Sequence, residues 1–544
     1  MGENRKQSVG AGFLILSVAS ISVKVISLVF VPVIRGFLGG DAGYSVYSTA
    51  YSVYAFIYVL TTAGFPVAIS KIVTELTVTK HSKEAEKAFC IARFFLICIG
   101  ILFTSLMAAF AKRIARFMDN EESWAGILCI APTLLICAVL SAYRGYFQGR
   151  KNMIPTASSQ IIEQIVHVVV SIILVIALKS KGIVWAVAGA SIGTAAGAFV
   201  ALLIVMHHYY KSRNDVRTAI SHERRIRISE KIEPVSTNTI IKKIFYYSLP
   251  ITLSSAVQYG GDLLDNKMIK GRLLEAGFDE FAAKSYHGAF MAMRQLINVP
   301  VALVTALCIS ILPAVASAYA VKNLKKVSER AIYGFNLCYT VCVPVITAMI
   351  VFARPIYTLL GYGSKNHVLL MASAVSVLLL GTMHLQSSIL QGVNRMFTSS
   401  AFLCLCVVIK AVLNYFLVAI PSVNIYGAVI ATYISYLIPV ILNHIVITKA
   451  EHIELPLTKI LFKPVIASLS MAVVAAPVYL ILRLIFKFTG GGYITNLICF
   501  LPAAVIGVAV YFFAMRKMGA LTNEELDEIS PKITKMLRKL KVIR

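Results

Sequence analysis

Charged residues are scarce in this sequence. Asp, Glu, Lys and Arg make up 14% of its 544 residues, whereas apolar residues make up 58%. A soluble domain carries about 25% charged residues, and a soluble fold of this length could not bury so much apolar surface. The composition therefore excludes an ordinary soluble protein and indicates a chain whose solvent is largely lipid.

Acidic residues are fewer still. The chain has 25 Asp and Glu against 52 Lys and Arg, which gives a formal net charge of +27. In a membrane protein most of such an excess lies in cytoplasmic loops, which collect Lys and Arg. The remainder can attract an anionic substrate. Because topology explains most of the basic excess, we expect no nucleic-acid partner.

Motifs of catalysis and metal binding are also missing. The sequence contains no P-loop, no HExxH and no GxGxxG, and no soluble stretch is long enough for a nucleotide-binding domain. No residue stands out as an enzyme nucleophile, so we expect a non-enzymatic protein without a cofactor. The ten cysteines lie mostly in apolar runs without a CxxC, and we expect neither disulfides nor a metal site.

What the sequence has in abundance is long apolar runs. A spanning helix needs about 20 such residues, and we expect about fourteen helices. The runs lie at 10–34, 46–70, 88–111, 125–145, 157–178, 184–210, 243–269, 284–316, 331–352, 367–391, 401–420, 425–447, 462–486 and 494–515. Lys and Arg gather in alternate loops, so we expect a multi-pass cytoplasmic-membrane protein with both termini in the cytoplasm.

Three landmarks recur and indicate an internal duplication. Pro66 to Ser70 matches Pro313 to Ser317, Gln148-Gly149 matches Gln391-Gly392, and Gly189-Ala190 matches Gly427-Ala428. An even number of helices in each repeat makes the repeats parallel. We therefore predict two parallel six-helix lobes around a central cavity, followed by two C-terminal helices.

The predicted segments follow from these landmarks. They are a first lobe at 1–210, a basic cytoplasmic linker at 211–242, a second lobe at 243–447, an extra helix pair at 448–515 and a cytoplasmic basic tail at 516–544. In the tail, Thr522 and Glu525 form a T-x-x-E capping box, and apolar residues alternate with Lys and Arg beyond Pro531. This pattern favours an amphipathic helix on the inner leaflet over a solvated tail.

Ionisable residues inside apolar runs mark candidate sites, because such residues usually belong to a substrate pathway or an ion pair. Lys24 and Arg294 lie deep in their runs, and neither has a carboxylate three or four residues away. We expect both to line an aqueous cavity and to bind an anion such as a diphosphate. The other candidates are Asp262, Asp265, Glu163, His167, Lys410, Asn414, and Arg35 with Asp41.

Several of these candidates have a structural alternative. Glu163 lies near the start of its helix, where a carboxylate stabilises the helix dipole. His167 is more often a hydrogen-bonded core histidine than a proton relay. Arg35 and Asp41 can pair with each other at the membrane interface, and Lys410 either pairs with Asp262 or Asp265 or lines the cavity as another cation.

Two segments carry a family resemblance. Gly64-Phe65-Pro66-Val67-Ala68-Ile69-Ser70-Lys71 resembles the end of the second helix in the polysaccharide-transport and stage V sporulation protein B branch of the multidrug/oligosaccharidyl-lipid/polysaccharide exporter superfamily. The run from Arg144 to Gly149, with the following Pro155 to Gln164, resembles the same branch. The lipid II flippases of this branch share the expected helix count. The resemblance implies a V-shaped cavity, alternating access, an undecaprenyl-diphosphate-linked substrate, and a lipid-tail groove formed by the extra helices.

Residue by residue, the resemblance is partial. Lys24 matches a basic residue of the first helix, and Arg294 matches an eighth-helix arginine of the lipid II flippases. Some members bind sodium between a seventh-helix aspartate and an eleventh-helix pair, but here that pair reads Lys410 and Asn414. Arg35 and Arg144 are further candidates for binding the headgroup, while Asp262, Asp265, Lys410, Asn414 and Glu163 are candidates for coupling or for tethering the lobe.

The expected function is to flip lipid II, an undecaprenyl-diphosphate-linked peptidoglycan precursor, from the inner to the outer leaflet. A flippase for another polyprenyl-linked oligosaccharide and a multidrug or cation antiporter are the alternatives. The expected partners are a lipid-linked anionic glycan and membrane lipids, and we expect a monomer in a bacterial cytoplasmic membrane.

Overall fold

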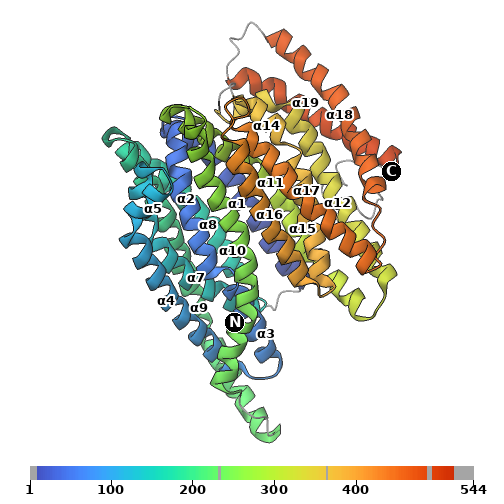
Figure 1. Ribbon diagram of the computed structural model, residues 1–544. Coiled ribbons are helices and arrows are strands. Elements are labelled where there is room, and N and C mark those ends of the chain that lie inside the picture. Colours follow the sequence, from blue (N-terminus) through green and yellow to red (C-terminus); the bar gives the residue numbers. More distant parts are fainter. Residues whose placement is uncertain (1–8, 231–234, 363–365, 487–492, 520–544) are drawn as a thin grey trace. The chain divides into compact units, whose positions relative to one another are not determined.

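In the computed structural model, which describes residues 9–230, 235–362, 366–486 and 493–519, the regular elements are all helices (Figure 1). The α-helices are α1 (Val9–Phe37), α2 (Asp41–Thr62), α3 (Phe65–Val78), α4 (Ser82–Ala109), α5 (Ala111–Phe117), α6 (Trp124–Ile130), α7 (Pro132–Gly149), α8 (Ile154–Leu178), α9 (Ile183–Glu230), α10 (Thr237–Glu275), α11 (Glu280–Ala320), α12 (Leu324–Val351), α13 (Ala353–Leu359), α14 (His367–Ser373), α15 (Ser376–Gly392), α16 (Met396–Leu417), α17 (Tyr426–Ile445), α18 (Leu457–Ile485) and α19 (Tyr493–Lys517). The predicted all-α fold is confirmed.

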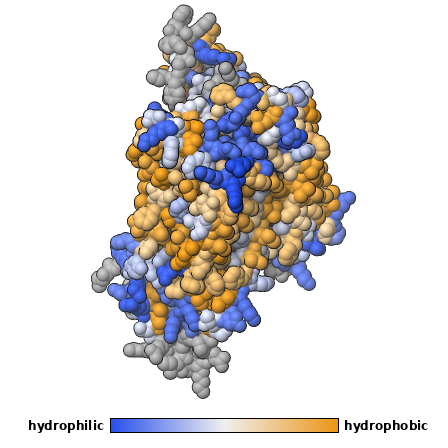
Figure 2. All heavy atoms as spheres, turned by 60° about the vertical axis from the view of Figure 1, so that its left-hand side comes forward, coloured by the Kyte–Doolittle hydropathy of each residue, from blue (hydrophilic) through white to orange (hydrophobic). Residues whose placement is uncertain are grey.

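Thirteen helical segments of the described chain are long and apolar enough to cross a membrane. The predicted span that is missing from this set is α10, which carries Asp262, Asp265, Lys267, Lys270 and Arg272 in its C-terminal half. Figure 2 shows apolar side chains over the middle of one face of the molecule and hydrophilic ones gathered toward its ends. The integral membrane class is therefore confirmed.

Some predicted runs are not single helices. The run at 46–70 is broken at Ala63 and Gly64 into α2 and α3. A Cβ on Gly64 would lie 2.0 Å from the backbone oxygen of Ser248 in α10, so only glycine permits this close approach. The runs at 125–145 and 367–391 are broken in the same way, into α6 and α7 and into α14 and α15.

Helix α9 is much longer than a bilayer requires. It has 48 residues and continues to Glu230, so most of the predicted linker at 211–242 is helical. At about 1.5 Å per residue its last 20 residues extend far beyond a spanning segment. The predicted amphipathic helix of the tail, with its capping box, lies outside the described residues.

The chain divides into two compact units. Unit 1 comprises Met1–Gln295 and Val407–Ala428, and unit 2 comprises Leu296–Cys406 and Val429–Arg544. Unit 1 therefore contains α1 to α10, the first part of α11 and the second half of α16. The predicted lobes at 1–210 and 243–447 follow a different criterion, the sequence repeat, and stay a prediction.

The element boundaries carry the duplication further than the three sequence landmarks. Helices α4 and α12 both have 28 residues, and α5 and α13 both have seven. Residues with a left-handed backbone recur at a spacing of 242 or 243 residues. The pairs are Lys80 and Lys322, Asp119 and Gly361, Lys151 and Asn394, and Gly182 and Asn424. Because these residues terminate helices, their recurrence indicates that the helix ends themselves were duplicated.

Candidate functional site

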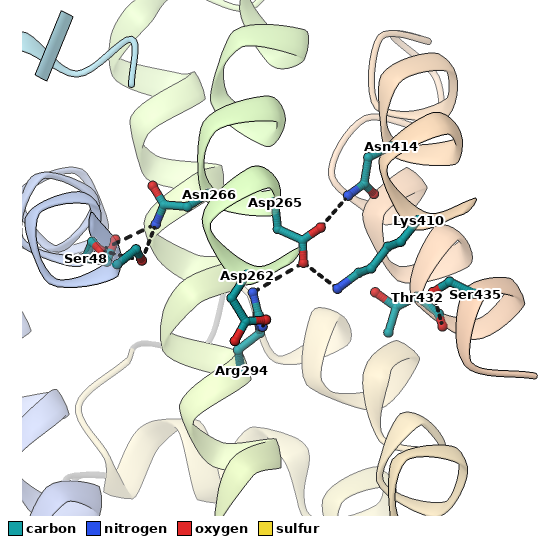
Figure 3. A network of polar contacts seen from close by, with 10 residues as sticks. Ser48, Asp262, Asp265, Asn266, Arg294, Lys410, Asn414, Thr432 and Ser435 are labelled. Carbon is teal, nitrogen blue, oxygen red and sulfur yellow. Dashed lines mark hydrogen bonds and ion pairs between the residues drawn. The ribbon is translucent and has the colours of Figure 1, made fainter. Parts of the chain in front are cut away.

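A cluster of charged and polar side chains in unit 1 surrounds one buried carboxylate, Asp265 of α10. Asp265 is 2% exposed and accepts hydrogen bonds from Lys410 Nζ and, at 2.8 Å, from Asn414 Nδ2, both in α16. Arg294 Nη1 of α11 lies 3.4 Å from the carboxylate oxygen that Lys410 contacts. Figure 3 shows these three side chains converging on Asp265 from two neighbouring helices.

The spacing within each helix explains this convergence. Lys410 and Asn414 are four residues apart, so they lie one above the other on the same face of α16. In α10 the residue before Asp262 is Gly261, where a Cβ would lie 2.9 Å from Val407 Cγ2 of α16. The missing side chain lets α16 approach α10 closely enough for the Lys410 ammonium to reach Asp265.

Arg294 joins this cluster to a second carboxylate. Its Nη2 atom pairs with Asp262 Oδ1, one turn before Asp265 on α10. The Asp262 side chain is 43% exposed, whereas that of Asp265 is 3% exposed. The cluster therefore has a dry side at Lys410 and a wet side at Asp262, and its two carboxylates balance its two cations.

Arg294, which has no carboxylate at helical spacing on its own helix, is paired in this structure. Its partners, Asp262 and Asp265, come from the preceding helix and lie 32 and 29 residues away in sequence. A search at helical spacing around Arg294 cannot find them. Lys410, in contrast, lies against Asp265, the pairing that the sequence offered as one of its two alternatives.

The opposite face of α10 is fixed to α2. Asn266 Nδ2 donates to Ser52 Oγ at 3.0 Å and lies 3.4 Å from the Ser48 carbonyl oxygen (Figure 3). Sequence reasoning missed Asn266, since an amide beside two aspartates carries no signal of its own. With Asp265 on one face and Asn266 on the next, α10 links α2 to α16 at a single level.

Arg144 and Glu163 form a separate ion pair between α7 and α8. Arg144 Nη2 lies 2.6 Å from Glu163 Oε2, and Arg144 Nε donates to Ser159 Oγ at 3.0 Å. Ser159 and Glu163 are one turn apart on α8, so together they present two acceptors to the planar guanidinium. Both charged side chains remain partly exposed, at 14% and 27%.

Arg35 and Asp41 also pair, across the turn from α1 to α2. Arg35 Nε lies 2.5 Å from Asp41 Oδ1, and the arginine is buried. Helix α11 packs directly on this turn, because a Cβ on Gly288 would lie 1.8 Å from the Asp41 carbonyl oxygen. This pairing is the structural alternative that the sequence left open for the two residues.

Lys24 differs from the other Lys and Arg residues that lie inside apolar runs. It lies on α1 in an exposed position, and the described part of the chain supplies it with no hydrogen bond or ion pair. His167, one turn after Glu163 on α8, packs its ring 4.8 Å from the ring of Phe30. Lys24 is thus the candidate whose charge is left for a ligand, while His167 lies in an aromatic contact.

Polar contacts also fix the C-terminal end of α10 and the N-terminal end of α11. Lys284 lies 2.5 Å from Glu122 Oε2, and Lys270 donates to the carbonyl oxygen of Asp119. His287 Nδ1 lies 2.7 Å from Ser45 Oγ. In the sequence these loop charges indicate only how the helices are oriented, so sequence reasoning missed this cluster.

Residues Gly189 to Gly193 have the G-x-S-x-G spacing of a hydrolase nucleophile elbow, which sequence reasoning missed. It lies inside α9 and not at a strand-to-helix turn, and Ser191 is fully buried. A Cβ on Gly193 would lie 2.1 Å from Ser171 Oγ, and one on Gly197 would lie 2.5 Å from the Glu163 carbonyl oxygen. These glycines therefore serve the close packing of α9 on α8, and Ser191 has no nucleophile geometry.

In unit 2 the extra helices α18 and α19 pack on each other, and α18 packs on α12. Asn496 of α19 donates to the Pro355 carbonyl oxygen and accepts from the Tyr479 hydroxyl, both at 2.9 Å. Tyr511 donates to the Thr340 carbonyl oxygen at 2.9 Å. The outward side chains of α18 include Leu469, Val473 and Leu484, which are 59%, 72% and 70% exposed. The pair is therefore firmly attached and offers an apolar surface to lipid chains.

Comparisons with known proteins agree with this architecture. A family model described as polysaccharide biosynthesis protein matches residues 9–319. The uncharacterized membrane protein YabM of Bacillus subtilis (strain 168) is 27% identical over 532 residues, which is 97% of this chain and 96% of that protein. The lipid II flippase MurJ of the same organism is 23% identical over 537 residues, covering 94% of this chain and 95% of that protein.

A solved structure shares the fold over nearly the whole chain. The lipid II flippase MurJ in an inward closed conformation aligns with a TM-score of 0.66 and 15% sequence identity. The alignment covers 93% of this chain and 99% of that structure's chain. At this identity it is evidence for the fold and not for the substrate.

Proposed function

Because this chain belongs to the polysaccharide biosynthesis protein family, within the multidrug/oligosaccharidyl-lipid/polysaccharide exporter superfamily, we propose that it flips a polyprenyl-diphosphate-linked glycan across the cytoplasmic membrane. Lipid II is the first candidate substrate. Its hydrophilic, anionic headgroup cannot cross hydrocarbon unaided, since each unscreened charge costs several kcal/mol or more. A path lined by fixed cations and dipoles replaces that lost hydration.

The observation that carries this proposal is the distribution of charge within the spans. The carboxylates that the sequence singled out all lie against a cation, namely Asp41, Glu163, Asp262 and Asp265. Lys24 has no such counter-charge within the described residues. A transporter with this balance attracts an anion, and a diphosphate accepts several charge-assisted hydrogen bonds from an ammonium.

In this proposal the cations have different roles. Lys24 binds the diphosphate, while Arg144 and Arg35 are held by Glu163 and Asp41 and contact the headgroup through their remaining N–H groups. Arg294 exchanges its contact with the exposed Asp262 for a contact with substrate, because Asp262 is its more solvated partner. Asp265, Lys410 and Asn414 tether α10 to α16 through the transport cycle.

The two alternative functions require different charges in the spans. A flippase for another polyprenyl-linked oligosaccharide needs the same diphosphate site, and the high coverage of the uncharacterized relative YabM leaves this substrate class open. An antiporter for cationic drugs needs an unpaired carboxylate within its spans, and each of the four candidates lies beside a cation. The charge balance therefore favours a flippase over an antiporter.

Complementation tests the proposal most directly. A bacterium depleted of its own lipid II flippase is expected to regain growth when it expresses this chain, and proteoliposomes are expected to translocate fluorescent lipid II. Rescue by the wild type but not by an Asp265→Ala variant, at equal membrane abundance, would support the assignment. Failure of both assays, together with translocation of another polyprenyl-diphosphate oligosaccharide, would move the function to the first alternative.

A further inference from the structure

Two tyrosines of unit 1, on the long helices α2 and α10, are exposed. Tyr51 of α2 is 38% exposed, and Tyr259 of α10 is 39% exposed. The two tyrosines lie on helices that pack against each other. They therefore belong to one exposed wall of unit 1, where α2 meets α10.

Carboxylates show that this wall faces water and not acyl chains. Asp262, 43% exposed, lies one turn from Tyr259 on the same face of α10. Glu163, 27% exposed, is paired with Arg144 of α7, and α7 packs on α2. A partly exposed carboxylate in the middle of a span is strongly disfavoured against lipid, so both tyrosine rings border an aqueous space.

The close packing of α2 and α10 fixes the two rings relative to each other. Asn266 donates to Ser52, the residue next to Tyr51, at 3.0 Å. A Cβ on Gly260, the residue next to Tyr259, would lie 3.3 Å from Phe56 Cε2. The rings are therefore presented by two helices that touch on either side of them.

Tyr51 is also part of a longer aromatic stripe. Tyr44, Tyr47, Tyr51, Tyr54 and Tyr58 follow each other at spacings of three and four residues along α2, with consecutive ring centroids 5.7–6.1 Å apart. Tyr44, Tyr47 and Tyr54 are buried, which holds the stripe in place. Tyr51 is the ring of this stripe that is most open to a ligand.

The charge of the wall selects the kind of ligand. Asp262 is paired with Arg294, and Glu163 is paired with Arg144, so the surroundings of the rings are nearly neutral. A neutral surface suits neither a free anion nor a free cation. Aromatic faces pack against the C–H faces of pyranose rings, while paired carboxylates and guanidiniums accept and donate hydrogen bonds to sugar hydroxyls.

We propose that Tyr51 and Tyr259, flanked by Asp262 and Glu163, form a carbohydrate-binding surface that holds a neutral sugar ring of the transported headgroup. This inference rests on the proposed function for its substrate class. It separates two tasks, since Lys24 would hold the diphosphate and the tyrosine pair would hold the glycan. The surface then distinguishes a glycan-bearing lipid from a bare polyprenyl diphosphate.

The test measures binding of N,N′-diacetylchitobiose, a neutral disaccharide, to the purified protein in nanodiscs by saturation-transfer NMR. Each aromatic ring is expected to strengthen binding about fivefold, so Tyr51→Leu or Tyr259→Leu weakens it about fivefold and the double variant about 25-fold. Tyr51→Phe and Tyr259→Phe keep the ring and are expected to retain most of the affinity. Tyr246→Leu is the matched control, because Tyr246 is a 76% exposed tyrosine elsewhere on α10.

A second measurement needs no substitution. In protein that is deuterated except at tyrosine, saturation of the tyrosine ring protons is expected to transfer to the sugar C–H protons. Absence of this transfer, or equal binding by the wild type and a folded double leucine variant, would overturn the carbohydrate site. Leucine-sensitive binding of tetraphenylphosphonium in place of the disaccharide would assign the rings to an aromatic cation and would also overturn it.

The outcome is separable from that of the proposed function. The disaccharide carries neither lipid nor diphosphate, and its binding requires no transport. Translocation of lipid II that is unaffected by the double leucine substitution would leave the flippase standing and remove the sugar site. Leucine-sensitive disaccharide binding without any translocation would keep the sugar site and remove the flippase.

Discussion

At the scale of single residues, the deciding question is which charges have partners. Asp265 is almost completely buried, and a lone carboxylate there would cost several kcal/mol. Lys410, Asn414 and Arg294 remove most of that penalty. Lys24 receives no comparable compensation from the described residues, and for this reason we propose that it binds the diphosphate.

Lys24 provides the first prediction. Lys24→Ala is expected to reduce flipping in proteoliposomes at least tenfold, while Lys24→Arg retains part of the activity because a cation remains. Lys179→Ala, which removes an exposed lysine after α8, serves as the control for a general loss of positive charge. Wild-type flipping by Lys24→Ala would take this residue out of the substrate path.

Lys410 and Asp265 provide the second prediction, which concerns stability. Lys410→Met leaves Asp265 buried without its closest cation, and removing one partner of such a pair costs about 3–5 kcal/mol. Thermal unfolding in detergent should therefore show a clear loss of stability for Lys410→Met. The double variant Lys410→Met with Asp265→Asn should recover much of it. Additive losses in the double variant would show that the two residues are not coupled.

At the scale of helices, close approach at glycine decides how the elements pack. Gly193 and Gly197 seat α9 on α8, Gly64 seats the α2–α3 break on α10, and Gly261 seats α16 beside Asp262. Small residues act in this way where lipid supplies no hydrophobic force between helices. The same contacts hold Glu163 in position, because Gly197 packs on its backbone oxygen.

Gly193 provides the third prediction. A side chain there would lie 2.1 Å from Ser171 Oγ and 2.5 Å from the Ser171 backbone nitrogen. Gly193→Val should therefore separate α8 from α9 and lower the unfolding temperature by several degrees, with a loss of about 2 kcal/mol or more. Gly36→Ala in α1 is the control, since a Cβ there meets nothing within 4 Å. An equally stable Gly193→Val would refute this packing role.

The tether between α10 and α16 provides the fourth prediction. If the Lys410 ammonium occupies the place of a bound cation beside Asp265 and Asn414, flipping needs no sodium. Replacing sodium by potassium in the proteoliposome assay should leave the rate unchanged, whereas Lys410→Asn should introduce a sodium dependence. A sodium requirement of the wild type would contradict this role of Lys410.

At the scale of the whole chain, the internal duplication organises the helix boundaries. The left-handed helix ends recur at 242 or 243 residues even where the residue type has changed, as at Lys151 and Asn394 or Asp119 and Gly361. Backbone geometry has thus been retained while charges diverged. The site reflects this divergence, because Lys410 and Asn414 of α16 correspond at an offset of 243 residues to His167 and Ser171 of α8.

The topology provides the fifth prediction. In a cysteine-free background, Arg225→Cys should be protected from membrane-impermeant maleimide in intact cells, because the distribution of Lys and Arg predicts that the basic segment after Tyr210 is cytoplasmic. Lys181→Cys, in the short turn between α8 and α9, should be labelled from outside. The opposite pattern would invert the topology and the direction assigned to the transport.

The sequence alone determined the helical membrane class and the duplication, because apolar length and the placement of Lys and Arg are properties of the linear chain. It also identified most residues of the site as candidates, since a charge inside an apolar run is conspicuous without any structure. It missed Asn266, Tyr51 and Tyr259, because neither an amide nor a tyrosine is unusual at those positions.

Only the tertiary structure decided which charges belong together. Arg294 looked unpaired because helical spacing reveals partners on its own helix, whereas Asp262 and Asp265 reach it from α10. Arg35 and Arg144 likewise find their carboxylates across a turn and on a neighbouring helix. Pairing between helices depends on their close approach and facing, which glycines such as Gly261 permit and which no periodicity within one helix encodes.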